Sequence, residues 1–236
     1  MIDKQYTKNC SSRKGAEIGG VILHFTGGGD SKSTIKWFKH PDSKASAHYV
    51  ISRSGVITQM VNESMAAWHA RSSTTKPKLN GKGNLNRWTI GIEICNWGWL
   101  YECQNNESVT INDKTYERKA GKIYTRFRRW TYEYKGETPT EIHRIKYDEC
   151  KALQNNKHWP GGDAVHWEPY TPSQIQSLEI LLKGIANRYQ NITKKWIATH
   201  ADVDPTRKLD IVGSFFPFSK ILGAVFQIET DEEFIP

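Results

Sequence analysis

Three places in the chain put a histidine or an acid where the local pattern predicts an apolar residue or the end of a strand. His24 lies near the end of one short apolar run, Glu93 lies inside another, and His200 begins the acidic run 200–210. An acid is rarely placed within a buried strand, because a carboxylate that loses water without gaining a partner is strongly destabilised. Polar residues at strand ends are typical of the sites of α/β domains. These places are therefore the candidate site.

Histidines at the ends of two strands converge when the strands are neighbours in a sheet. Zinc binds imidazole nitrogen and carboxylate oxygen, and a catalytic zinc site uses three protein ligands and leaves one position open for water. Each residue alone also has a structural interpretation. His24 could be a hydrogen-bonded core residue, and His200 or Asp210 could cap a helix or a turn.

Apolar patterns around these residues predict strands mixed with helices. A threonine, a proline and a glutamine at Thr171, Pro172 and Gln174 form a capping box that opens a helix with one apolar face. The predicted strands are 21–25, 47–52, 56–61, 89–94 and 196–200, with a turn at 53–55; the other predicted helix is 33–40, capped by Ser33, and 71–87 is predicted to be a surface loop. The fold class is therefore α/β, with a mixed central β-sheet covered by helices.

The composition is that of one folded domain of generous size, or of two small ones. The 236 residues carry 33 Lys+Arg against 25 Asp+Glu, a net charge of +8, and 37% of them are hydrophobic. We favour a single domain over 1–236 with a core at about 18–225, an aromatic and basic insertion at about 101–166, and an acidic tail at about 227–236.

Several features bear on where the protein works. No run is long and apolar enough to span a membrane, and the start of the chain lacks the apolar run of a secretion signal. The four cysteines contain no Cys-x-x-Cys pair, which favours synthesis in a reducing compartment. We expect a monomer that is made in the cytoplasm without membrane insertion. The positive charge suits nucleic acid, an anionic membrane or a bacterial wall, so it identifies no partner alone.

Five short motifs, taken in order, carry a resemblance to a known family. They are VILHFT (21–26), SAHYVI (46–51), WHA (68–70), IGIEI (90–94) and HADVDPTRKLD (200–210). In this order they resemble the zinc-dependent N-acetylmuramoyl-L-alanine amidases, the group that includes bacterial AmpD enzymes, phage lysozyme-amidases and peptidoglycan recognition proteins. The resemblance spans residues 21 to about 213.

The resemblance implies a role for each candidate residue. His24 and His200 match the two zinc histidines, and Asp210 matches the third zinc ligand. Lys208 matches a lysine that stabilises the developing oxyanion. The positions matching the substrate cleft are Trp68, His69 and Asn86.

Members of the family differ in the residue that assists the attacking water. One branch has a tyrosine before the histidine of the second motif, where this chain has Ala47. The AmpD-like branch uses the glutamate of its fourth motif, which is Glu93 here. The resemblance therefore assigns the chain to the glutamate branch, with Glu93 as the catalytic acid and base.

The chain departs from the family after the third ligand. The family usually continues with Pro-Gly, whereas here Ile211 and Val212 precede Gly213. Asp202 and Asp204 therefore remain alternative ligands.

The resemblance implies a peptidoglycan hydrolase that cleaves the amide bond between N-acetylmuramic acid and L-alanine with a zinc-activated water. Its partner is bacterial peptidoglycan, whose anionic groups would attract the positive chain. We expect a phage-type endolysin, bacteriolytic and antimicrobial, that acts on the cell wall after release from the cytoplasm. Two alternatives are a cytosolic wall-recycling amidase and a non-catalytic peptidoglycan-binding module on the same fold.

A nucleic-acid-binding protein is a further class to consider. Arg126, Arg128, Arg129 and Trp130 interleave basic and aromatic side chains, which can contact phosphates and stack on bases. This interpretation matches no motif and explains none of the histidines. We therefore expect no nucleic-acid partner.

Overall fold

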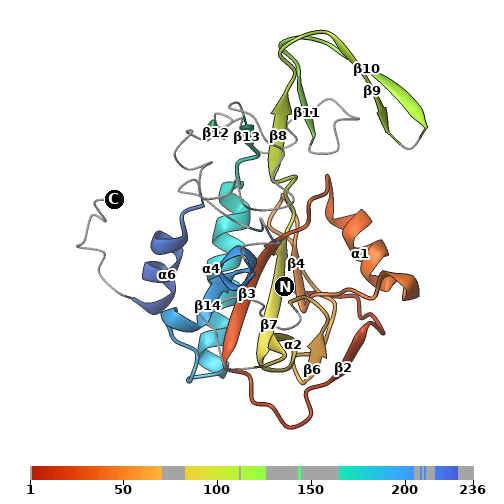
Figure 1. Ribbon diagram of the computed structural model, residues 1–236. Coiled ribbons are helices and arrows are strands. Elements are labelled where there is room, and N and C mark those ends of the chain that lie inside the picture. Colours follow the sequence, from red (N-terminus) through yellow and green to blue (C-terminus); the bar gives the residue numbers. More distant parts are fainter. Residues whose placement is uncertain are drawn as a thin grey trace.

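A six-stranded mixed sheet forms the centre of the protein (Figure 1). The computed structural model describes residues 2–70, 83–111, 113–125, 143–144, 165–204, 208, 210 and 216–227. The strands, in their order across the sheet, are β1 (Asp3–Lys4), β5 (Ile57–Gln59), β4 (Tyr49–Ile51), β7 (Thr89–Ile94), β3 (Gly20–Phe25) and β14 (Ile197–Thr199). The pairs β4–β7, β7–β3 and β3–β14 are parallel, and β4–β5 is antiparallel.

One face of this sheet is apolar and is covered by two helices. Alternate residues of β3 and β7 pack with α4 (Pro172–Arg188) and α6 (Phe218–Phe226) in one core cluster. Burying the face against α4 excludes water from both, and this apolar burial is the main stabilising term. The two helices lie together on one side of the sheet in Figure 1. The strand residues in this cluster are Val21, Leu23, Phe25, Ile90, Ile92 and Ile94.

The opposite face carries the polar residues of the central strands. Side chains alternate along a strand, so His24 shares this face with Ile22, and Glu93 shares it with Thr89. It is flanked by α1 (Ser31–Lys39), η1 (Pro41–Ser43), the short helix α2 (Leu85–Trp88) and the two-stranded sheet of β2 (Cys10–Ser12) with β6 (Met65–Ala67). Two shorter elements, η2 (Lys194–Trp196) and α5 (His200–Val203), flank β14.

A second sheet occupies the described part of the predicted insertion. It contains β11 (Ile123–Thr125), β8 (Trp99–Glu102), β13 (Val165–Trp167) and β12 (His143–Arg144), and a hairpin of β9 (Glu107–Ile111) and β10 (Lys114–Arg118) extends from it (Figure 1). The basic residues 126–129, Cys150 and most of the predicted tail lie outside the described residues. The division into core, insertion and tail stays a prediction.

Most predicted elements are confirmed, with shifted ends. The strands at 21–25 and 89–94 and the capping box of α4 form as expected. Two details of the prediction from sequence were wrong: the cap of the first helix and the extent of the loop 71–87. The cap of α1 is Asp30, whose carboxylate accepts the Ser33 N–H at 2.7 Å, because an aspartate acceptor placed before the first turn competes successfully with serine. The predicted loop 71–87 contains the start of α2, capped by Asn84.

The described residues include no helix long and apolar enough to cross a membrane. The three described cysteines, Cys10, Cys95 and Cys103, are free thiols.

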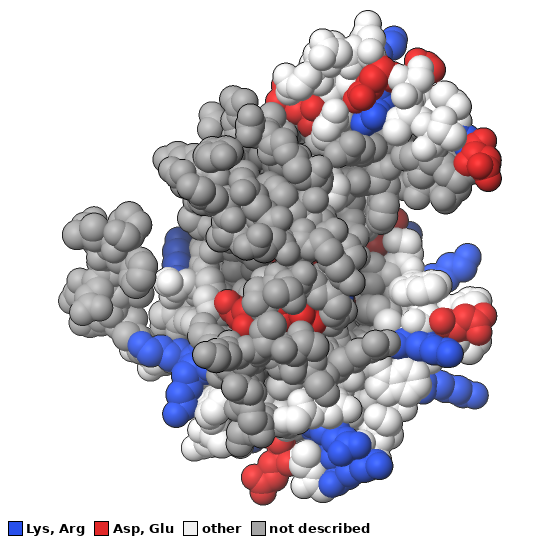
Figure 2. Space-filling view, viewed as in Figure 1, with Lys and Arg blue, Asp and Glu red and all other residues white. Residues whose placement is uncertain are grey.

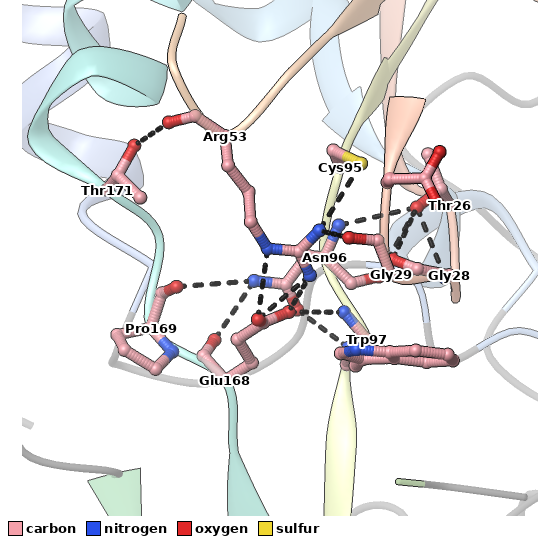
Figure 3. Close-up of polar contacts among 12 residues, drawn as sticks. Thr26, Gly28, Gly29, Arg53, Cys95, Asn96, Trp97, Glu168, Pro169 and Thr171 are labelled. Atoms are coloured by element: carbon pink, nitrogen blue, oxygen red, sulfur yellow. Dashed lines mark hydrogen bonds and ion pairs between the residues drawn. The ribbon is translucent and has the colours of Figure 1, made fainter. Parts of the chain in front are cut away.

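Arg53 lies at the centre of a buried polar cluster (Figure 3). Its guanidinium donates to both carboxylate oxygens of Glu168, with Nη2 to Oε2 at 2.7 Å, and to the carbonyl of Gly29. The same carboxylate accepts the Trp97 N–H at 2.5 Å, and the Thr171 hydroxyl donates to the Arg53 carbonyl at 2.7 Å. The cluster ties the β4–β5 turn to the loops after β3 and β7 and to the start of α4. These are the loops that border the polar residues at the carboxyl ends of the strands.

Glu168→Ala should destabilise the fold by about 3–5 kcal/mol, because it leaves the Arg53 guanidinium buried without its partner. The two side chains are 2% and 12% exposed. Urea unfolding followed by circular dichroism measures the change. Asp42→Ala is the control, since the Asp42 carboxylate is 87% exposed beside His40 and should contribute less than about 1 kcal/mol. Equal effects of the two substitutions would contradict this assignment.

Candidate metal centre and catalytic residues

The pairing of β14 with β3 brings two histidines together. Thr199 is the register partner of Leu23, so the residues that follow them, His200 and His24, are neighbours. Their ring centroids lie 4.5 Å apart, and both rings are buried. The chain turns into α5 directly after Thr199, whose hydroxyl accepts the Asp202 N–H at 3.2 Å in a capping box.

The carboxylate of Asp210 completes a three-residue group. Its Oδ2 lies 3.2 Å from Nδ1 of His24 and 2.9 Å from Nδ1 of His200. One donor atom from each of the three residues lies within 4.8 Å of the others. The alternative acids have other roles or positions: the Asp202 carboxylate accepts the Thr199 N–H at 2.8 Å, and Asp204 is not in this group.

The chemistry of this donor set fits a zinc ion. Two imidazoles and one carboxylate are ligands that zinc accepts, and imidazole must be neutral to bind it. Burial, and then the neighbouring His200, lower the pKa of His24 to about 4. Burial alone would raise the pKa of Asp210, but the two histidines hold it well below its ordinary value. Nε2 of His200 is buried with no hydrogen-bond partner among the described residues.

Glu93 is the register partner of His24 on the neighbouring strand, so its side chain lies on the same face of the sheet. Burial, and then the negative charge of Asp210, raise the pKa of Glu93 to about 8, while Lys208 opposes the shift. Its Oε2 is buried and has no hydrogen-bond partner among the described residues. A carboxyl group with this proton affinity is suited to accept and return a proton near neutral pH.

Lys208 lies close enough to the group for its charge to act on His24 and on Glu93. The Lys208 N–H donates to the Asp204 carbonyl at 2.9 Å, which holds the loop that carries the side chain. Ala47 is fully buried and offers no side-chain hydroxyl. Glu93 is therefore the acid–base candidate that the described residues place beside the group.

The three residues predicted to contact substrate have different surroundings. Nδ1 of His69 lies 3.0 Å from Nε2 of His24, which puts His69 beside the group of His24, His200 and Asp210. Asn86 is buried, and its side-chain oxygen accepts the His69 N–H at 3.1 Å. Trp68 points to the β2–β6 sheet, where its indole N–H donates to Ser11 at 3.3 Å. Substrate binding by these residues stays a prediction.

Two residues of β7 escaped the sequence analysis. Thr89 lies 3.2 Å from Nε2 of His69 through its hydroxyl. A Cβ on Gly91 would lie 2.5 Å from the His69 ring, so only glycine leaves room for that ring. A lone glycine inside a strand is the signal that could have found this contact, because it often marks a close approach of another group.

Comparison with known proteins identifies the family. The model of the N-acetylmuramoyl-L-alanine amidase family matches residues 14–211. The chain is 45% identical over 74 residues to N-acetylmuramoyl-L-alanine amidase A of Achromobacter lyticus, covering 31% of this chain and 34% of that protein. It is 24% identical over 182 residues to the 1,6-anhydro-N-acetylmuramyl-L-alanine amidase AmpD of Haemophilus influenzae, covering 77% and 59%. The matches thus span only part of the relatives' length.

A solved structure shares the fold. The complex of the N-acetylmuramyl-L-alanine amidase AmiD from E. coli with anhydro-N-acetylmuramic acid-L-Ala-D-gamma-Glu-L-Lys superposes with a TM-score of 0.52 at 22% identity, covering 92% of this chain and 66% of that one. At this identity the likeness establishes the fold alone. Because the family model covers most of the chain, the protein belongs to the N-acetylmuramoyl-L-alanine amidase family.

Proposed function

We propose that the protein is a zinc-dependent hydrolase of bacterial peptidoglycan that cleaves the amide bond between N-acetylmuramic acid and L-alanine. The observation that carries the proposal is the convergence of donor atoms from His24, His200 and Asp210 beside Glu93, on one face of the sheet. Glu93, whose Oε2 is buried with no hydrogen-bond partner among the described residues, gives this site an acid–base group that binding alone does not require.

The residues present divide the reaction between them. A zinc ion held by His24, His200 and Asp210 would act as a Lewis acid and lower the pKa of water. Glu93 holds the attacking water and accepts its proton as the water oxygen bonds to the amide carbon. The ammonium group of Lys208 stabilises the negative charge on the carbonyl oxygen. Glu93 then gives the proton to the leaving L-alanine nitrogen as the carbon–nitrogen bond breaks.

We further propose that the enzyme works as a phage-type endolysin on the intact cell wall, made in the cytoplasm and acting after release. Its net charge of +8 favours an anionic polymer as partner, because long-range attraction raises the encounter rate. On the side of the molecule shown in Figure 2, the described Lys and Arg side chains lie among acidic ones and do not form one patch. Arg126, Arg128 and Arg129, which are close together in the sequence, are the candidates for a local wall contact.

A cytosolic wall-recycling amidase is the second candidate, favoured by the match to the Haemophilus AmpD. The two settings differ in substrate. Mass spectrometry of digests of purified wall and of a soluble anhydro-muropeptide, run side by side, separates them. Cleavage of the intact wall at a comparable rate supports the endolysin, whereas cleavage of the soluble compound alone supports recycling.

The purified protein should bind about one zinc ion, and His24→Ala or His200→Ala should abolish both zinc binding and cleavage, since each removes one of three ligands. Elemental analysis after gel filtration measures the metal. His40→Ala is the control, because the His40 ring is 54% exposed and is not one of the three residues of the group. Full cleavage by metal-free protein would overturn the proposal.

Glu93→Gln should retain zinc while kcat falls on the order of 10²–10⁴-fold, because glutamine keeps the shape of the side chain but cannot accept a proton. Turnover of a soluble muramyl-peptide, with zinc content measured on the same sample, tests this. Glu117→Gln, on the exposed hairpin, should leave kcat unchanged. Normal turnover by Glu93→Gln would assign the base to another residue.

Neutralising Arg126, Arg128 and Arg129 together should weaken sedimentation with wall fragments and flatten the salt dependence of binding, because the anionic wall loses its local partner. Cleavage of a small soluble muramyl-peptide should hardly change.

A triple substitution of Lys32, Lys36 and Lys39 on α1 removes the same charge from another segment of the chain and is the matched control. If both triple variants lose the same wall affinity, only net charge matters. A collapse of activity on the small substrate in the arginine variant would instead put the segment beside the active site.

A further inference from the structure

His69 contacts His24, one of the candidate metal ligands, at the ring nitrogen that faces away from Asp210. Its Nδ1 is 3.0 Å from Nε2 of His24, and its Nε2 is 3.2 Å from the hydroxyl of Thr89. The backbone of His69 is held by Asn86, whose side-chain oxygen accepts the His69 N–H. Both ring nitrogens of His69 are thus occupied by defined neighbours.

The direction of these hydrogen bonds follows from Thr89. Its hydroxyl oxygen lies 2.6 Å from the Leu85 carbonyl, which can only accept, so the one hydroxyl hydrogen is donated there. Toward His69 the Thr89 oxygen can then only accept. The proton of a neutral His69 ring therefore lies on Nε2, and its Nδ1 has a free lone pair.

The direction of the hydrogen bond at His24 follows from the tautomer of His69. Because Nδ1 of His69 accepts, Nε2 of His24 must be the donor in the 3.0 Å contact. A neutral His24 then has its lone pair on Nδ1, the nitrogen that lies 3.2 Å from Asp210 Oδ2. Two lone pairs facing each other at this distance repel unless a cation lies between them.

We propose that Thr89 and His69 are positioning residues that hold His24 in the tautomer and orientation in which Nδ1 binds the metal. The proposal rests on the zinc site proposed above. In metal sites generally, the partner of the second imidazole nitrogen selects the tautomer and raises the affinity of the ligand. Here that partner is a second imidazole, itself held by a threonine hydroxyl and not by a carboxylate.

Gly91 supports the assignment independently. The His69 ring lies across β7 where Gly91 has no side chain, and a Cβ there would lie 2.5–2.8 Å from its ring atoms. The backbone N–H of Gly91 donates to Nδ1 of His48 at 2.9 Å, so the neighbouring imidazole is held separately. His48 Nε2 lies 3.0 Å from the Met65 carbonyl, and its ring does not compete for the nitrogens of His69.

The test measures zinc affinity in the full chain, apart from activity. Metal-free protein is titrated with Zn²⁺ against a chromophoric chelator, for wild type, Thr89→Val and Thr89→Ser. Valine keeps the branched shape at this fully buried position but cannot accept the hydrogen bond from Nε2–H of His69. We expect Thr89→Val to weaken zinc binding by about 10–100-fold. Thr89→Ser keeps the hydroxyl and should stay close to wild type.

Three further measurements separate positioning from loss of structure. With Co²⁺ in place of zinc, the visible absorption bands of Thr89→Val should change, because they respond to ligand geometry, while those of Thr89→Ser should not. Gly91→Ala, which displaces the His69 ring, should weaken zinc binding as well. Thermal unfolding of each variant without metal shows whether the fold is intact.

The outcomes are distinct. If wild type binds no zinc, the proposed function fails. If wild type binds zinc and Thr89→Val binds it equally well with an unchanged Co²⁺ spectrum, the positioning role is overturned and the metal site stands. An equal loss in Thr89→Ser would also overturn it, because the hydroxyl would then not be the group that matters.

Discussion

His24 stands between its two main neighbours because β3 pairs in parallel with β7 on one side and with β14 on the other. The register of the first pair sets Glu93 opposite His24, and the register of the second sets His200 beside it. A slip of one residue in either pair would turn the side chains to the other face of the sheet, into the apolar core under α4. The apolar residues that alternate with the polar ones hold these registers, so the core and the site depend on the same pairing.

The polar face accumulates groups that are destabilised by burial. His24, His200 and Asp210 lose water together, and the pKa values of His24 and Glu93 move in the directions that favour their neutral forms. Burial would raise the pKa of Asp210, but its contacts with His200 and, more weakly, with His24 lower it. A cation bound by these side chains would compensate the free-energy cost of burying them. The metal-free protein should therefore be less stable than the metal-bound protein.

Local patterns predicted the strands and the α4 capping box well, since each depends on residues close together in the chain. The candidate ligands also came from the sequence, through motifs whose order resembles a family. The contacts between His69, Thr89 and Gly91 could not be predicted in this way. They depend on the segment that follows β6 packing against β7, which belongs to a different sheet. A local sequence pattern does not show that the His69 ring lies against Gly91. The buried contacts of Arg53 with Glu168 and Gly29 are of the same kind, because they join distant segments.

Backbone hydrogen bonds connect described residues of the segment from His200 to Asp210. The Ala201 N–H donates to the Asp210 carbonyl at 3.3 Å, and the Lys208 N–H donates to that of Asp204, so the loop closes on itself before residue 211. The position of Asp210 is therefore decided within the loop and by the two histidines. Strand β3 positions His24, and the segment after β14 positions Asp210. Both side chains contact His200, the residue that directly follows β14.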